Sequence, residues 1–274
     1  LPEWVHESQA GGKMFKKYMG IYVECIKISV STAMTYRFNF LLDNFIMLVS
    51  NTLFPLVTLL IYGSGAEFPE WSLYEVLLIQ AIFTMSTAIA DIFFGGVLWA
   101  TMRHVIEGSL EIVLLKPVDC LFFLIASTVD FSSISLFLGG GIMFAVALSN
   151  IGRVSVLMVL QFIILFIAGI CVMMGISLIM AATSFKWVGN SRLPEIFDSI
   201  KYFGRYPQNI FHKAISAVTS FVVPVAMIGY FPAAALLGEA NVIALAAILP
   251  CIAFMMAGVF LFRHMVHMYE GVGG

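Results

Sequence analysis

The sequence predicts an all-α integral membrane protein, and its composition, its long apolar segments and the distribution of its basic residues lead to this fold class. Hydrophobic residues make up 61% of the 274 positions, and charged residues make up 11%. A soluble domain typically carries about 25% charged residues. So few charged side chains cannot cover the surface of a water-soluble domain of this size. We therefore expect most of the chain to lie in lipid.

Six segments are long and apolar enough to cross a bilayer. A spanning helix needs about 20 mostly apolar residues, because the hydrocarbon core is about 30 Å thick and a helix rises about 1.5 Å per residue. The third segment contains Gly139–Gly140–Gly141, which predicts a flexible or closely packed point. The predicted transmembrane helices are residues 38–62, 71–94, 120–148, 154–183, 214–237 and 242–262.

Ahead of the first span, residues 13–36 predict an amphipathic helix that lies in the membrane interface. Residues 1–12 are polar, so we expect no secretory signal there. An alternative is that residues 13–36 simply extend the first span. The amphipathic pattern places Phe15, Met19, Tyr22 and Ile26 on one face and Lys16, Gly20, Glu24 and Lys27 on the other.

The basic residues fall almost entirely on one side of this arrangement. Under the six-span order, Arg153 is the one Lys or Arg of the 14 that lies on the far side. The positive-inside rule then places both termini in the cytoplasm. The outer loops are short, whereas the inner loops 100–119 and 184–213 are longer and hold most of the charge. We therefore expect the chain to meet its aqueous partners on the cytoplasmic side.

The chain carries no motif typical of an enzyme. It has no phosphate loop, no zinc-protease motif and no nucleophile elbow. Its four cysteines lack the spacing of a metal site or a disulfide framework. His264 and His267 share a helix face, and a solvated helix end is preferred there over a metal site. With a net charge of −2, nucleic acid is not an expected partner either. We expect no catalytic, cofactor-binding or metal-binding residues in this chain.

Polar residues inside the predicted spans form a second pattern, because each is costly in lipid and should face the bundle interior. They either join helices by hydrogen bonds or line a translocation path. We place Asp130 nearest the midplane and Asp91 near the cytoplasmic boundary. No basic residue is expected deep in the membrane, so a cationic substrate and a protonated Asp130 both remain open. The candidates for the path are Asn44, Asn51, Gln80, Thr84, Thr87, Asp91 and Asp130.

Residues 101–117, in the first inner loop, predict a short amphipathic helix. The pattern indicates a break at Gly108 and an end at Pro117. A segment that is charged on one side and apolar on the other suits docking to a cytoplasmic partner. The alternative is that it lies along the membrane surface without a partner.

Taken in order, these features resemble ABC-2-type transporter permeases. The resemblance rests on the interfacial helix, on Tyr36-Arg37-Phe38-Asn39-Phe40 at the first span, and on two later motifs. These are Glu107-Gly108-Ser109-Leu110 followed by Leu114-Leu115-Lys116-Pro117, and Gly204-Arg205-Tyr206-Pro207. It covers nearly the whole chain and is strongest for six-span bacterial permeases of the viologen-exporter-like branch.

The resemblance implies a fold, partners and site residues. Residues 1–274 would form one transmembrane permease domain of the ABC-2 (type V exporter) fold in the bacterial inner membrane. A second permease, the same chain or a relative, and two cytoplasmic ATPase subunits would complete an exporter, with ATP and Mg²⁺ bound by the ATPases. A secondary transporter that uses Asp130 is the alternative function. The residues implied to couple to the ATPase are Arg103, Glu107, Gly108, Glu111 and Lys116.

Overall fold

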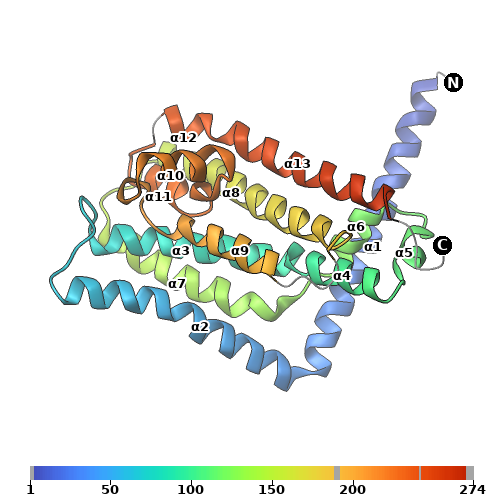
Figure 1. The fold of residues 1–274 in the computed structure, drawn as a ribbon, viewed down its shortest axis with the longest axis horizontal. Helices are drawn as coiled ribbons and strands as arrows, with labels where there is room; N and C mark the ends of the chain where they lie inside the picture. The colour runs from blue at the N-terminus through green and yellow to red at the C-terminus, as the bar shows by residue number, and fades with distance from the viewer. Residues whose placement is uncertain (1–2, 188–191, 241, 270–274) are drawn as a thin grey trace.

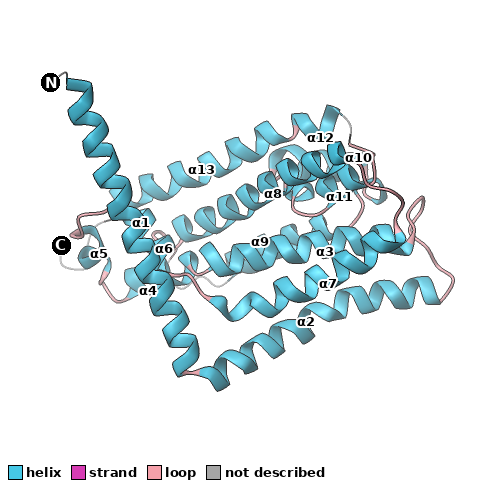
Figure 2. Ribbon diagram, turned by 180° about the vertical axis from the view of Figure 1, so that it is seen from behind, coloured by secondary structure: helices cyan, strands magenta, loops and turns pink. Residues whose placement is uncertain are grey.

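The computed structural model describes residues 3–187, 192–240 and 242–269, and the regular structure in these residues is entirely helical (Figure 2). Five helical stretches are long and apolar enough to cross a membrane. The predicted all-α membrane fold is therefore confirmed. The five stretches are Arg37–Gly63, Leu73–Ile106, Phe131–Asn150, Val156–Thr183 and Ala244–His267.

The first two helices meet at a corner. Helix α1 (Glu3–Thr35) crosses one end of the bundle, and α2 (Arg37–Gly63) runs along the bundle's edge (Figure 1). Helix α1 contains all but the last residue of the segment 13–36 that is predicted to lie in the membrane interface. Helix α2 matches the predicted first span to within one residue at each end.

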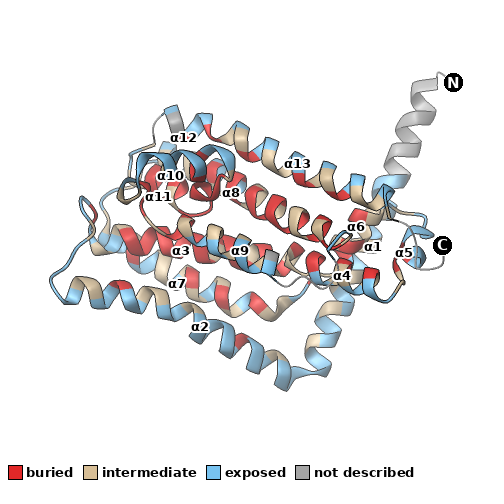
Figure 3. Cartoon of the chain, in the orientation of Figure 1, coloured by how far each residue is buried: buried red, intermediate tan, exposed pale blue. Residues whose placement is uncertain are grey.

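The second span is longer than expected. Helix α3 (Leu73–Ala90) continues through a π-helical turn, η1 (Asp91–Gly95), into α4 (Val97–Ile106). The whole stretch is 34 residues long, and 78% of an apolar 18-residue window within it is buried, so α3 is the central helix of the bundle (Figure 3). The prediction ended this span at residue 94 and placed an inner loop at residues 100–119. A short helix, α5 (Leu110–Leu114), follows it.

The predicted third span is wrong in its first third. Helix α6 (Cys120–Ser127) is separated from α7 (Ile134–Asn150) by an irregular turn and the 3₁₀ helix η2 (Phe131–Ser133). The break is stabilised by Asp130, whose backbone N–H donates to the Ile92 carbonyl over 2.9 Å. Close packing near the triple glycine is confirmed at Gly140, where a Cβ would lie 2.9 Å from Met85 Cγ on α3.

Two long helices pack closely on the other side of α3. Helix α8 (Val156–Thr183) matches the predicted fourth span. The sixth span is confirmed as α12 (Val242–Ala246) and α13 (Ile248–His267), which extends five residues further than predicted. A Cβ on Gly258 of α13 would lie 2.9 Å from the Gly175 carbonyl of α8. The two backbones approach because neither position carries a side chain.

The predicted fifth span, 214–237, is wrong because this segment is not one helix. It consists of short pieces: α10 (Lys213–Ala217), η5 (Val218–Val222), η6 (Val225–Met227) and α11 (Tyr230–Leu236). Pro224 has no N–H to continue a helix. Residues 225–236 are apolar because they are almost entirely buried in protein, and hydropathy does not distinguish such burial from contact with lipid. We call residues 213–236 the re-entrant hairpin.

The predicted cytoplasmic loop 184–213 instead runs along the bundle. It contains α9 (Arg192–Lys201), η3 (Tyr202–Arg205) and η4 (Gln208–Ile210). It begins near α4 and α5, at what we call the elbow end (Figure 1). At the opposite, hairpin end, Asn209 Oδ1 accepts a hydrogen bond of 2.8 Å from Trp71 Nε1. We call residues 192–213 the fifth passage because they connect the two ends of the bundle, although this segment is not one of the five candidate spans.

Candidate functional site

The predicted amphipathic segment forms a sharp turn that we call the elbow, residues 103–116. The predicted break at Gly108 is confirmed, since α4 ends at Ile106 and α5 begins at Leu110. Gly108 has a φ of +65°, a conformation that favours glycine. The Ser109 N–H donates to the His104 carbonyl over 3.0 Å, which closes the end of α4.

The elbow has an inner and an outer surface. Val105, Leu110 and Val113 are buried and attach it to the core. Leu115 is 85% exposed, although it lies outside the candidate spans. An exposed surface that mixes apolar and charged side chains is typical of protein docking. The exposed side chains are Arg103, Ile106, Glu107, Glu111, Ile112, Leu114, Leu115 and Lys116.

The end of the elbow is held by three other parts of the chain. Lys17 Nζ of α1 donates to the Pro117 carbonyl over 2.6 Å. The Asp119 N–H donates to the Tyr18 hydroxyl over 3.1 Å, and Arg263 of α13 pairs with the Asp119 carboxylate. Of the five coupling candidates, Lys116 is partly engaged, because its Nζ lies 3.6 Å from the centroid of the Phe123 ring of α6. Movement of the elbow would therefore reach α1, α6 and α13.

Helix α2 is joined to the bundle by polar side chains at every seventh residue. Asn44 and Thr58 are its buried residues, and every residue of this helix is described. Asn44 Oδ1 accepts from the Ser135 N–H over 2.9 Å, and Gln80 Nε2 donates to Thr58 Oγ1 over 2.7 Å. Asn44 and Gln80 therefore each form a hydrogen bond between two helices, which is one of the two alternatives that the sequence left open.

Asn51, the remaining polar residue in this seven-residue spacing on α2, contacts the buried guanidinium of Arg205. Asn51 Oδ1 accepts a hydrogen bond of 3.3 Å from Nη2 of Arg205, which is 4% exposed. The Arg205 guanidinium carbon lies 4.0 Å from the ring centroid of Phe54, 4.7 Å from that of Phe83 and 4.6 Å from that of Tyr202. The expectation that no basic residue lies deep was wrong, because the segment carrying Arg205 was assigned to a loop.

The two acidic candidates exchange their expected places. Asp91 lies in the middle of the 34-residue span, half-buried and close to the Asp198–Lys201 ion pair of 2.8 Å on α9. Asp130 lies just outside the third span and is exposed, and its carboxylate accepts from the Ser132 N–H over 2.9 Å. The midplane position predicted for Asp130 is therefore wrong. A helical break at residue 130 gives no strong signal in an apolar sequence.

The remaining candidates lie on α3. Thr84 and Thr87 are buried, and Thr87 Oγ1 has no hydrogen-bond partner among the described residues. Thr87 lies one turn beyond Phe83, which contacts Arg205. Of the path candidates, Asn51 contacts Arg205 directly, and Gln80 and Thr87 lie about one turn on either side of Phe83.

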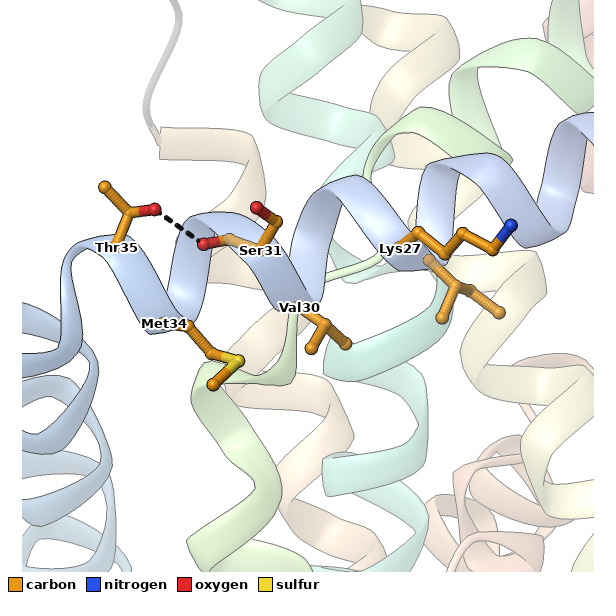
Figure 4. Close-up of a pocket in the computed structure, with 6 residues that line it drawn as sticks. Lys27, Val30, Ser31, Met34 and Thr35 are labelled. Atoms are coloured by element: carbon orange, nitrogen blue, oxygen red, sulfur yellow. Dashed lines mark hydrogen bonds between the residues drawn. The ribbon is translucent and has the colours of Figure 1, made fainter.

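A concavity of about 500 Å³ lies elsewhere, on α1 (Figure 4). Lys27, Val30, Ser31 and Met34 line it, and they all come from this one helix. It is open to the surroundings and separate from the polar residues of α2 and α3. In the described residues, no group of three or more His, Cys, Asp or Glu side chains is arranged to hold a metal ion.

These features define a polytopic α-helical membrane protein with the exposed elbow at one end and the re-entrant hairpin at the other. The family described as ABC-2 family transporter protein matches residues 45–273. This match covers most of the chain, and the protein belongs to that family. It is a permease-type component of membrane transport and is not itself catalytic. Neither the search of curated proteins nor that of solved structures gave a match.

Proposed function

We propose that this chain is the permease subunit of an ABC exporter in the bacterial inner membrane. It forms the translocation path with a second permease and is driven by two cytoplasmic ATPase subunits that bind ATP and Mg²⁺. The elbow carries this proposal, because it is an exposed turn of mixed polarity at the end of the longest span. The second permease and the direction of transport rest on the family resemblance.

The elbow is connected directly to the centre of the bundle. Helix α4 continues into α3 through η1, without a loop in between. Leu110 and Val113 are buried against the core, so α5 moves with it. A force applied to the exposed residues Glu107 and Glu111 would therefore act on the most buried helix. This connection is what an ATPase that closes on the elbow would need.

The charge distribution supports a cytoplasmic elbow. Arg103, Lys116 and Arg263 lie at the elbow end. The revised fifth passage moves Lys213 to the hairpin end and takes Arg205 into the bundle, but most basic residues stay at the elbow end. The hairpin end instead carries acidic residues, including Glu70, Glu75 and Glu239, whose charges interact. By the positive-inside rule, the elbow end faces the cytoplasm.

The alternative function, a secondary transporter that uses Asp130, loses support from the geometry. Asp130 is exposed, lies outside the candidate span and caps a turn. Asp91 takes the more central position, but Lys201 and Asp198 lie close to it, so it is not a lone intramembrane acid. We therefore retain the ABC exporter as the proposed function.

The test begins with purification of the tagged chain from membranes of its native host in mild detergent. We expect a chain with a phosphate loop to co-purify in a one-to-one ratio with the permease and to hydrolyse ATP. Purification of the permease without an ATPase would contradict the proposal.

The second step reverses charge on the elbow. Glu107→Lys combined with Glu111→Lys should reduce the ATP hydrolysis that co-purifies by about tenfold, as expected when charges at an interface are reversed. Glu67→Lys combined with Glu239→Lys is the matched control, because both residues are exposed and lie at the hairpin end. Hydrolysis unchanged by the elbow variant would remove the elbow from the coupling site.

A further inference from the structure

The positive charge of Arg205 has no neutralising partner. A guanidinium offers several N–H donors. Among the described residues, only Asn51 accepts a hydrogen bond from the guanidinium, over 3.3 Å, and Nε has no partner. No carboxylate of the described residues forms an ion pair with Arg205. Buried charges are normally paired, so this arrangement needs a functional explanation.

Three aromatic rings hold the charge instead. Phe54 comes from α2, Phe83 from α3, and Tyr202 from the same 3₁₀ turn as Arg205. A cation over a ring face is stabilised by the ring's quadrupole, but the positive charge is not neutralised. The charge therefore remains available to an anion.

Further unused polar atoms lie in the segments around Arg205. Gln208 follows it on the same segment, and its Oε1 accepts a 2.6 Å hydrogen bond from Thr219, whereas its Nε2 has no partner. On α3, the Oε1 of Gln80 and the Oγ1 of Thr87 are also without partners. These two residues lie about one turn on either side of Phe83. A group of buried polar atoms without partners indicates a ligand or water.

The backbone that carries Arg205 is fixed on the side of the hairpin. A Cβ on Gly204 would clash with the Val225 carbonyl, and one on Gly229 would lie 2.6 Å from the Gly204 carbonyl. Helix α2, on the other side, buries only two of its described side chains, Asn44 and Thr58 (Figure 3). Helix α2 is therefore the side of the Arg205 environment that can move.

We propose that Arg205 binds an anionic group of the transported substrate when α2 moves away. This inference rests on the proposed function and names its substrate class. Withdrawal of Asn51 and Phe54 leaves the guanidinium facing the space that α2 had filled. Because the neighbouring hairpin is apolar, the ligand is an amphiphile with a phosphate or carboxylate head group.

The first experiment uses the permease alone in neutral detergent. Dodecyl phosphate should raise the thermal unfolding temperature in a saturable manner, whereas dodecyltrimethylammonium and inorganic phosphate should not. Arg205→Lys should weaken the binding of dodecyl phosphate several-fold, and Arg205→Gln should abolish it. An equal shift with the cationic amphiphile, or a shift retained in Arg205→Gln, would overturn the proposal.

A second variant keeps the test decisive if Arg205→Gln does not fold. Asn51→Ala removes the one hydrogen bond that competes for the guanidinium, while Arg205 and its three rings remain. We expect this variant to bind dodecyl phosphate several-fold more tightly than the unmodified chain. Binding that is unchanged or weaker would contradict the proposal.

The assembled complex separates this inference from the proposed function. Dodecyl phosphate should stimulate ATP hydrolysis by the complex with its ATPase, and Arg205→Gln should remove this stimulation. A coupled ATPase that responds only to cationic amphiphiles would refute the inference and leave the proposed function intact. Arg205-dependent binding by a chain that co-purifies with no ATPase would support the inference and contradict the proposed function.

Discussion

Arg263 Nη2 lies 3.3 Å from Asp119 Oδ2, and this ion pair joins the last part of α13 to the chain three residues after the elbow. The same carboxylate accepts from the Phe122 N–H over 2.9 Å and caps α6. The Asp119 N–H in turn donates to Tyr18 of α1. Asp119 therefore connects the elbow with three helices.

Substitutions of Asp119 should separate its cap from its ion pair. Asp119→Ala should lower the free energy of unfolding by about 1–2 kcal/mol, because it removes both interactions. Asp119→Asn keeps a good capping side chain, so it should lower the free energy of unfolding by less than about 1 kcal/mol. Unfolding in neutral detergent measures both values. Equal losses for the two variants would show that the cap contributes nothing.

The positive φ of Gly108 predicts a specific cost of adding a side chain. Gly108→Ala should destabilise the protein by about 1–2 kcal/mol, because alanine is strained in this region, and Gly108→Asn should cost less. Gly20→Ala is the control, since Gly20 lies in α1 with open space around its Cα, and alanine favours a helix there. Thermal unfolding of the three variants checks the order. A neutral Gly108→Ala would contradict the left-handed turn.

The hydrogen bond between Gln80 and Thr58 predicts a non-additive pair of substitutions. Thr58→Val leaves the Gln80 amide without its partner and should cost about 1–2 kcal/mol. Adding Gln80→Leu removes the unpaired amide, so the double variant should be more stable than the sum of the single effects predicts. A double-mutant cycle of unfolding free energies measures the coupling. Simple additivity would mean that this contact does not join α2 to α3.

The carboxyl of Glu239, at the hairpin end, predicts that the stability of the folded chain depends on pH. Glu239 is exposed, but partial desolvation of its carboxyl raises the pKa, and the negative charges of Glu75 and Glu70 add to this effect. A carboxyl whose pKa is raised on folding favours the folded state when protonated, so this contribution is lost as pH rises through the raised pKa. Glu239→Gln should therefore be slightly more stable than the unmodified chain at neutral pH, and the difference should vanish near pH 4.

The pH comparison has a simple control. Glu67 is exposed at the same end of the molecule, and Glu67→Gln should give no pH-dependent difference in unfolding temperature. If Glu239→Gln is less stable than the unmodified chain at neutral pH, the carboxylate is stabilised by its surroundings, and the sign of the shift is wrong.

Hydropathy predicted the helices that face lipid along most of their length. The spans formed by α2 and α8 were located to within two residues, because each is one long helix of mostly apolar residues. The elbow and its break were also predictable, since Gly108 and Pro117 interrupt the pattern. These features depend on local sequence and on burial in lipid.

The fifth passage was not predictable in the same way. Residues 225–236 are apolar because protein covers them, whereas α9 carries the Asp198–Lys201 pair and has the composition of a loop. Hydropathy therefore assigned the passage to the wrong segment. The burial of Arg205 depends on rings from α2 and α3, and such tertiary contacts leave no periodic signal in the sequence.

The central claim is that the elbow docks on an ATPase, and site-specific photo-crosslinking in membranes tests it most directly. A benzophenone amino acid replaces Leu115 on the elbow or, as control, Leu60 near the far end of α2. These side chains are 85% and 72% exposed. The claim predicts an adduct from position 115 with a peptide of a phosphate-loop ATPase, and none from position 60. An ATPase adduct from position 60, or no ATPase adduct from position 115, would contradict it.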